Sequence, residues 1–135
     1  MSAFLSALSY YVVSASALWL VVVGVFAVLR PDKARKALGL MGSTARIHFT
    51  EHILRCLVGA AFIIASPDLL FPTQFMWFGV FLCVSSVVIM AAPRHWHHSY
   101  AVFWADRVPP KIMRLMGTAS ILIGVWLVWV LLMAD

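Results

Sequence analysis

Charged residues are scarce in this 135-residue chain, at 11% of the sequence, whereas hydrophobic residues make up 64%. A soluble domain is roughly 45–50% apolar and about 25% charged. In water, a chain of this composition would expose more apolar surface than its few charges could cover. The shortage of charge therefore excludes a soluble globular protein, a disordered tail and a nucleic-acid-binding module. The class that remains is an integral membrane protein.

Cysteine and acidic residues are also few. Cys56 and Cys83 both lie in apolar runs and form neither a CxxC pair nor a metal-binding spacing, which favours small core residues. Glu51 is the only glutamate.

Residues 1–9 contain no Lys or Arg, so the positive segment of a secretory signal peptide is missing. We therefore expect the first apolar stretch to be a transmembrane helix and not a cleaved signal.

Four apolar runs fill most of the chain, and each approaches the length of about 20 residues that a membrane-spanning helix needs. Backbone groups inside a bilayer must satisfy one another, so runs of this length are helices. The predicted spans are 10–29, 47–65, 73–92 and 112–133. We predict an all-α fold in which residues 1–135 form one bundle of four transmembrane helices. This leaves no room for a soluble catalytic domain, and we expect no enzymatic activity.

Lysine and arginine are concentrated in two segments between the spans. Five of them lie in 30–46 and four in 94–114, whereas the middle loop, 66–74, has none. Cytoplasmic loops of membrane proteins carry an excess of basic residues. The pattern therefore predicts that both basic loops are cytoplasmic and that both termini are outside.

Both basic segments are also predicted to contain short helices in the membrane interface. In 94–107, Trp96, Tyr100 and Phe103 recur at helical spacing on one face, as in helices whose rings lie at headgroup depth. The pattern in 31–41 is similar but weaker. We expect these segments to contact membrane lipids.

The order of span, proline, basic segment and span occurs twice, in 10–65 and 73–133. Pro31 and Pro93 occupy corresponding places in these halves. One interpretation is a parallel internal repeat. The alternative is that any four-helix protein with two basic loops has this pattern.

The second span carries a polar face. His48, Glu51, His52 and Arg55 follow at i, i+3, i+4 and i+7, so they share one side of the helix. A charge at the centre of a membrane helix costs at least about 2.5–3.5 kcal/mol, so this face should point into the bundle. There we expect an ion pair between Glu51 and Arg55, with Ser85, Ser86 and Gln74 as further candidate partners.

The simplest role for this face is a structural polar cluster that fixes the helix register, with no cofactor. The alternatives are a haem ligand, a site for a quinone head, and a metal site formed by His48, His52 and a histidine of the following loop. His48 to His52 also match H-x-x-E-H, an inverted zinc-protease motif. That motif needs a third, acidic ligand, and no acidic residue is suitably placed, so a protease is not expected.

Several short motifs are scattered between residues 47 and 128: Glu51-His52-x-Leu54-Arg55-x3-Gly59, Pro67, Phe71-Pro72 and Pro93-Arg94-x-Trp96-His97. This combination resembles small hydrophobic bacterial inner-membrane proteins of uncharacterised activity. The resemblance implies a multi-pass protein of the bacterial inner (plasma) membrane and no particular reaction.

Two functions follow as expectations. The first is a non-enzymatic accessory or scaffold subunit that docks with a larger membrane complex or with lipid. The alternative is a small carrier or cofactor-binding protein, for quinone, haem or metal, that uses the face of His48, Glu51, His52 and Arg55. No nucleic-acid partner is expected in either case.

Overall fold

The computed structural model describes residues 2–134 and confirms the predicted all-α fold. Its elements are α1 (Ser2–Leu29), α2 (Pro31–Gly39), α3 (Ala45–Ala65), the short 3-10 turn η1 (Ser66–Asp68), α4 (Pro72–Ala91), α5 (Arg94–Arg107) and α6 (Pro110–Leu132). Within the described residues, α1, α3, α4 and α6 are long and apolar enough to cross a membrane. The chain is therefore a multi-pass membrane protein.

Three of the four predicted spans agree with the helices to within about two residues at each end. The first does not, because α1 begins at Ser2 instead of Tyr10. The serines before Tyr10 interrupt the apolar run in the sequence, but they do not interrupt the helix. Ser9 illustrates the reason: its hydroxyl donates to the Ser6 carbonyl at 2.7 Å, so the polar group is satisfied within the helix itself.

Prolines begin most of the later helices. Pro31, Pro72 and Pro110 each occupy the first turn of α2, α4 and α6, where a missing N–H costs nothing. The helix that carries the polar face, α3, begins differently. The Thr44 side chain accepts a hydrogen bond from the Ile47 N–H at 3.1 Å and caps it.

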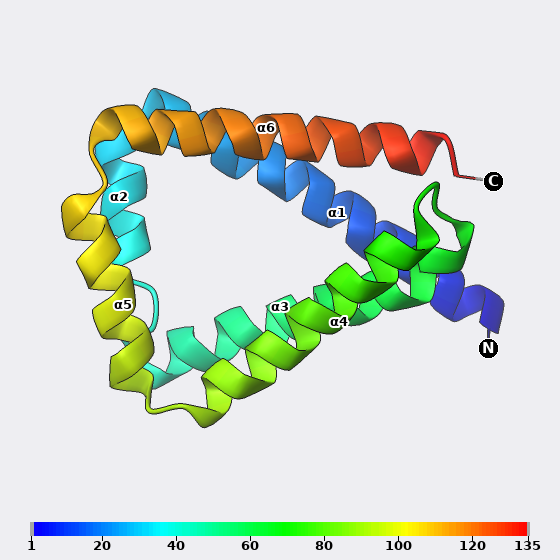
Figure 1. Ribbon diagram of the computed structural model, residues 1–135, viewed down its shortest axis with the longest axis horizontal. Coiled ribbons are helices and arrows are strands. Elements are labelled where there is room, and N and C mark those ends of the chain that lie inside the picture. The colour runs from blue at the N-terminus through cyan, green and yellow to red at the C-terminus, as the bar shows by residue number, and fades with distance from the viewer. Residues whose placement is uncertain (1, 135) are drawn as a thin grey trace.

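The spans pack as two pairs, α1 with α6 and α3 with α4 (Figure 1). Glycines allow the helices of each pair to touch at the backbone. A Cβ added at Gly24 would lie 2.5 Å from the Gly117 carbonyl oxygen, and one added at Gly79 would lie 2.5 Å from that of Gly59. Small residues at such crossings are typical of membrane helices, which gain contact area from close approach.

The two pairs converge at one end of the molecule and separate at the other (Figure 1). The convergent end holds the larger apolar core, to which all four spans and the loop before α4 contribute. Its residues are Val13, Ala17, Ala61, Phe62, Ala65, Leu69, Phe75, Leu127 and Val130. At the wide end, α2 and α5 pack against each other and lie crosswise to the spans (Figure 1). Both ends of the chain lie away from α2 and α5.

Some helix contacts match the predicted repeat and others do not, because α1 packs on α3 whereas α4 has no comparable contact with α6 among the described residues. Exchanging the two halves maps the α1–α6 pair onto α4–α3 and the α2–α5 pair onto itself. The duplication itself stays a prediction, but the arrangement has one consequence for the site. The crossed helices α2 and α5 bring the start of α5 against the start of α3.

Candidate metal centre

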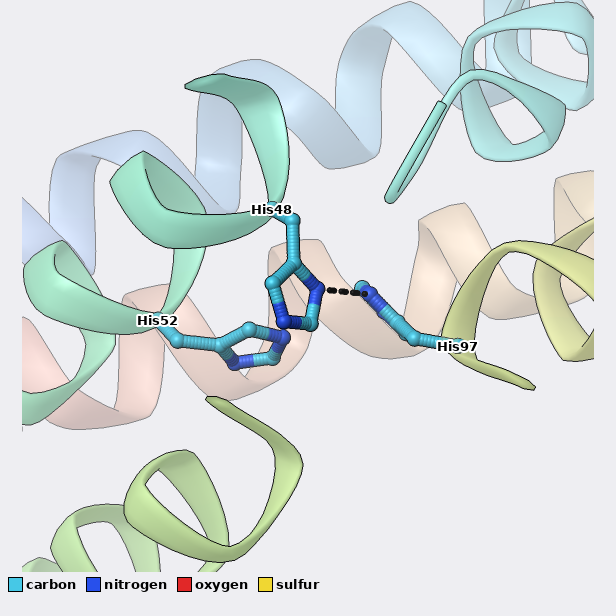
Figure 2. A group of neighbouring side chains, drawn as sticks. All are labelled: His48, His52 and His97. Atoms are coloured by element: carbon cyan, nitrogen blue, oxygen red, sulfur yellow. Dashed lines mark hydrogen bonds between the residues drawn. The ribbon is translucent and has the colours of Figure 1, made fainter. Parts of the chain in front are cut away.

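Three histidines from two helices meet at the wide end of the bundle (Figure 2). His48 and His52 lie one turn apart on α3, and His97 reaches them from α5. One ligand nitrogen from each lies within 4.8 Å of the others. The Nδ1 atoms of His48 and His97 are 3.1 Å apart. Two nitrogens on one tetrahedral zinc, at bond lengths of about 2.0–2.1 Å, lie roughly 3.4 Å apart. The His48–His97 pair is therefore close to the spacing of two ligands on one metal ion, and the third nitrogen would have to move inward to join them.

Two of the three histidines are buried, and their ring nitrogens are poorly satisfied by hydrogen bonds. His48 and His52 expose only 1% and 4% of their surface. His48 Nε2 and both ring nitrogens of His52 have no hydrogen-bond partner among the described residues. Most buried polar atoms in proteins have such a partner, and leaving one without it costs about 1–3 kcal/mol. A metal ion takes one nitrogen from each ring, and both His48 and His52 have a nitrogen without a hydrogen-bond partner that could serve.

The first turn of α5 is anchored so that His97 faces α3. Arg94 donates through Nη1 to the carbonyls of Gly42, at 3.1 Å, and Ser43, at 2.6 Å. His98 Nδ1 lies 3.0 Å from the Met41 carbonyl, which can only accept, so this nitrogen carries the proton. The residues on both sides of His97 therefore bind the segment that leads into α3.

Gly42 makes this approach possible. It has a φ of +65°, the left-handed region that residues with a Cβ rarely adopt. A Cβ placed here would also lie 2.8 Å from His97 Nδ1. Backbone conformation and space thus both require glycine beside the cluster.

The surroundings of His97 lower its pKa. Burial is the main cause, and the neighbouring His48, His98 and Arg55 add to it. A lowered pKa favours the neutral imidazole, whose free lone pair is the ligand.

The predicted ion pair between Glu51 and Arg55 is wrong. In the part of the chain that the structure describes, the only ion pair joins Arg35 and Asp32, at 4.0 Å. Arg55 instead donates through Nη2 to the Ser85 hydroxyl on α4, at 3.0 Å, and lies over the Phe81 ring. Because α4 packs directly on α3, the guanidinium finds its acceptor across the helix pair. Ser85 was among the partners expected from the sequence.

Glu51 also stands apart from the histidines. One of its carboxylate oxygens, Oε2, is buried without a hydrogen-bond partner among the described residues, and the metal-sized group does not include it. The four residues of the predicted polar face therefore divide by role. His48 and His52 join the cluster, Arg55 binds α4, and Glu51 forms no hydrogen bond or ion pair with either among the described residues.

The sequence alone does not decide which of the three histidines after α4 joins His48 and His52. His98 is committed to the Met41 carbonyl, and His95 packs edge-on against Trp96. Only His97 is brought to α3.

Comparison of the chain with models of known protein families, with curated proteins and with solved structures gave no match.

Proposed function

We propose that this protein is a metal-binding membrane protein and that His48, His52 and His97 hold one divalent transition-metal ion, with zinc as the first candidate. The observation that carries the proposal is the convergence of three imidazoles, two of them buried and with ring nitrogens that have no hydrogen-bond partner among the described residues. Neutral imidazole suits zinc, copper, iron and nickel. None of the three ligands is a carboxylate or a thiolate, so the site would keep the full positive charge of a divalent ion. Three ligands on a tetrahedral ion would also leave its fourth coordination position open.

The geometry favours a metal ion over haem, which is another of the alternatives for the polar face of α3. A bundle cytochrome holds the macrocycle between two facing histidines. Here the three rings contact one another, with centroids 4.8–5.3 Å apart. A porphyrin would have to separate rings that now converge on one point.

The setting proposed for this centre is the cytoplasmic side of a bacterial inner membrane. The basic segments lie at the α2–α5 end of the bundle, and the positive-inside rule assigns that end to the cytoplasm. Both termini would then be outside. Docking with a larger membrane complex stays a prediction, and a metal centre at the cytoplasmic end is compatible with an accessory subunit.

The test is a titration of the full chain, purified in detergent and stripped of metal. Cobalt is a useful first probe, because a tetrahedral cobalt site absorbs strongly in the visible region, and zinc then competes for it. We expect one ion per chain. His52→Ala should abolish the cobalt spectrum, and His95→Ala, which removes a neighbouring histidine outside the cluster, should leave it intact. Equal binding by both variants would refute the proposal.

A further inference from the structure

A pocket of about 510 Å³ adjoins the three-histidine centre. Its wall is formed by residues of α2 to α6 and the adjoining loops, at the end where the two helix pairs separate. His52 and His97 both line it, and His48 does not. A metal ion bound between His52 and His97 would therefore stand at the pocket wall. Small-molecule sites in proteins are commonly about 300–1,000 Å³ in volume.

Most of the pocket wall is apolar. Ile89, Trp104, Ile112 and Met116 contribute from three different helices. Among the described residues, Arg55 is the only permanently charged side chain on this wall. A pocket with apolar sides and one cation at its polar end matches a molecule with an apolar body and one polar head.

The Arg55 guanidinium is held in place by a hydrogen bond but still has a donor without a partner among the described residues. Its Nη2 is committed to Ser85 at 3.0 Å, which fixes the guanidinium. Its Nε is buried and has no hydrogen-bond partner among the described residues. Since a guanidinium can only donate, the group that completes this site must carry an acceptor oxygen.

We propose that this pocket binds a lipid-soluble molecule through an acceptor-oxygen head, such as a quinone carbonyl or a fatty-acid carboxylate. The head lies between Arg55 and the open position of the metal, and the apolar body lies against Ile112 and Met116. The contact with the metal rests on the function proposed above. The contact with Arg55 and the apolar wall does not.

Native mass spectrometry of the zinc-loaded chain tests this, because one spectrum counts bound zinc and bound ligand separately. Decylubiquinone and palmitate are the two probes. We expect one molecule of at least one probe per chain, and the probe that binds identifies the head. Arg55→Leu should keep zinc and weaken ligand binding by about tenfold or more. His48→Ala should lose zinc without altering the pocket wall.

Two variants fill the pocket without touching a histidine. Ile112→Trp and Met116→Trp both lie on α6 and should retain zinc while losing the ligand. Leu115→Trp is the matched control, because Leu115 is on the same helix but outside the pocket. Ligand occupancy equal to that of Leu115→Trp in both pocket variants would overturn the proposal, as would the absence of any adduct on zinc-loaded protein. Failure of the metal proposal is a different result, namely wild-type chain without zinc.

Discussion

The Nδ1 atoms of His48 and His97 face each other at 3.1 Å, although 49 positions separate the two residues in the chain. Two neutral imidazoles can form one hydrogen bond at this distance, which would satisfy the two Nδ1 atoms. The ring of His52 lies 4.8 Å from that of His97, and neither of its nitrogens has a partner among the described residues. A single shared proton therefore leaves the cluster incomplete, whereas one cation would engage all three rings.

Metal binding should stabilise the fold, since a ligand that binds only the folded chain shifts the unfolding equilibrium by mass action. With free zinc about 100-fold above its Kd, the expected gain is about 2.7 kcal/mol. The measurement is thermal unfolding in detergent with and without zinc, followed by chelation to reverse the shift. His48→Ala should show no shift. A shift of equal size in that variant would mean that zinc binds elsewhere.

Gly42→Ala should weaken metal binding by about 10–100-fold, the range seen when groups that orient metal ligands are altered. The new Cβ would meet His97 Nδ1 at 2.8 Å and strain a backbone whose φ is +65°. Cobalt titration with zinc competition measures the loss. Gly39→Ala is the control, because its Cβ would meet only the Ala105 side chain, at 3.3 Å, far from the histidines. Similar affinity in both variants would contradict the role of Gly42.

The spans and the crosswise helices were predictable because their signals are local. Apolar runs about 20 residues long define α3, α4 and α6, and prolines mark where most helices begin. The polar face of α3 was visible for the same reason, since helical spacing alone places His48 and His52 on one side.

Two features could not be predicted, namely which histidine after α4 joins the cluster and that Arg55 binds Ser85 and not Glu51, because both depend on how helices dock. Nothing in the sequence distinguishes His97 from His95 or His98 until Arg94 is seen to bind the loop before α3. Similarly, an acid one turn away made Glu51 the obvious partner for Arg55. Only the close α3–α4 packing, which the glycine contacts permit, presents Ser85 instead.

The arrangement of the helices predicts where reporters fused to this chain will be active. Both termini lie at the opposite end of the bundle from α2 and α5, and the basic residues predict that α2 and α5 are cytoplasmic (Figure 1). A reporter active only in the cytoplasm should be silent when fused to the C-terminus. The same reporter inserted between α2 and α3 should be active. Activity at the C-terminus would reverse the assignment.

The last prediction compares Ser85 with Glu51. Ser85 accepts a hydrogen bond from Arg55 across two helices, whereas Glu51 has no ion-pair partner among the described residues and keeps a buried oxygen unsatisfied. Hydrogen bonds between membrane helices contribute about 0.6 kcal/mol on average and up to about 1.7 kcal/mol. Ser85→Ala should therefore lower the stability in detergent by about this amount.

Glu51→Gln should leave stability unchanged or raise it, because the amide keeps the shape of the side chain and removes a half-buried charge that has no ion-pair partner among the described residues. Thermal unfolding of the two single variants and of the double variant completes the comparison. Since the two residues share no contact, their effects should add to within about 0.5 kcal/mol. A larger loss from Glu51→Gln than from Ser85→Ala would restore Glu51 as the partner of Arg55, and Arg55 would then not be free to bind an acceptor in the pocket.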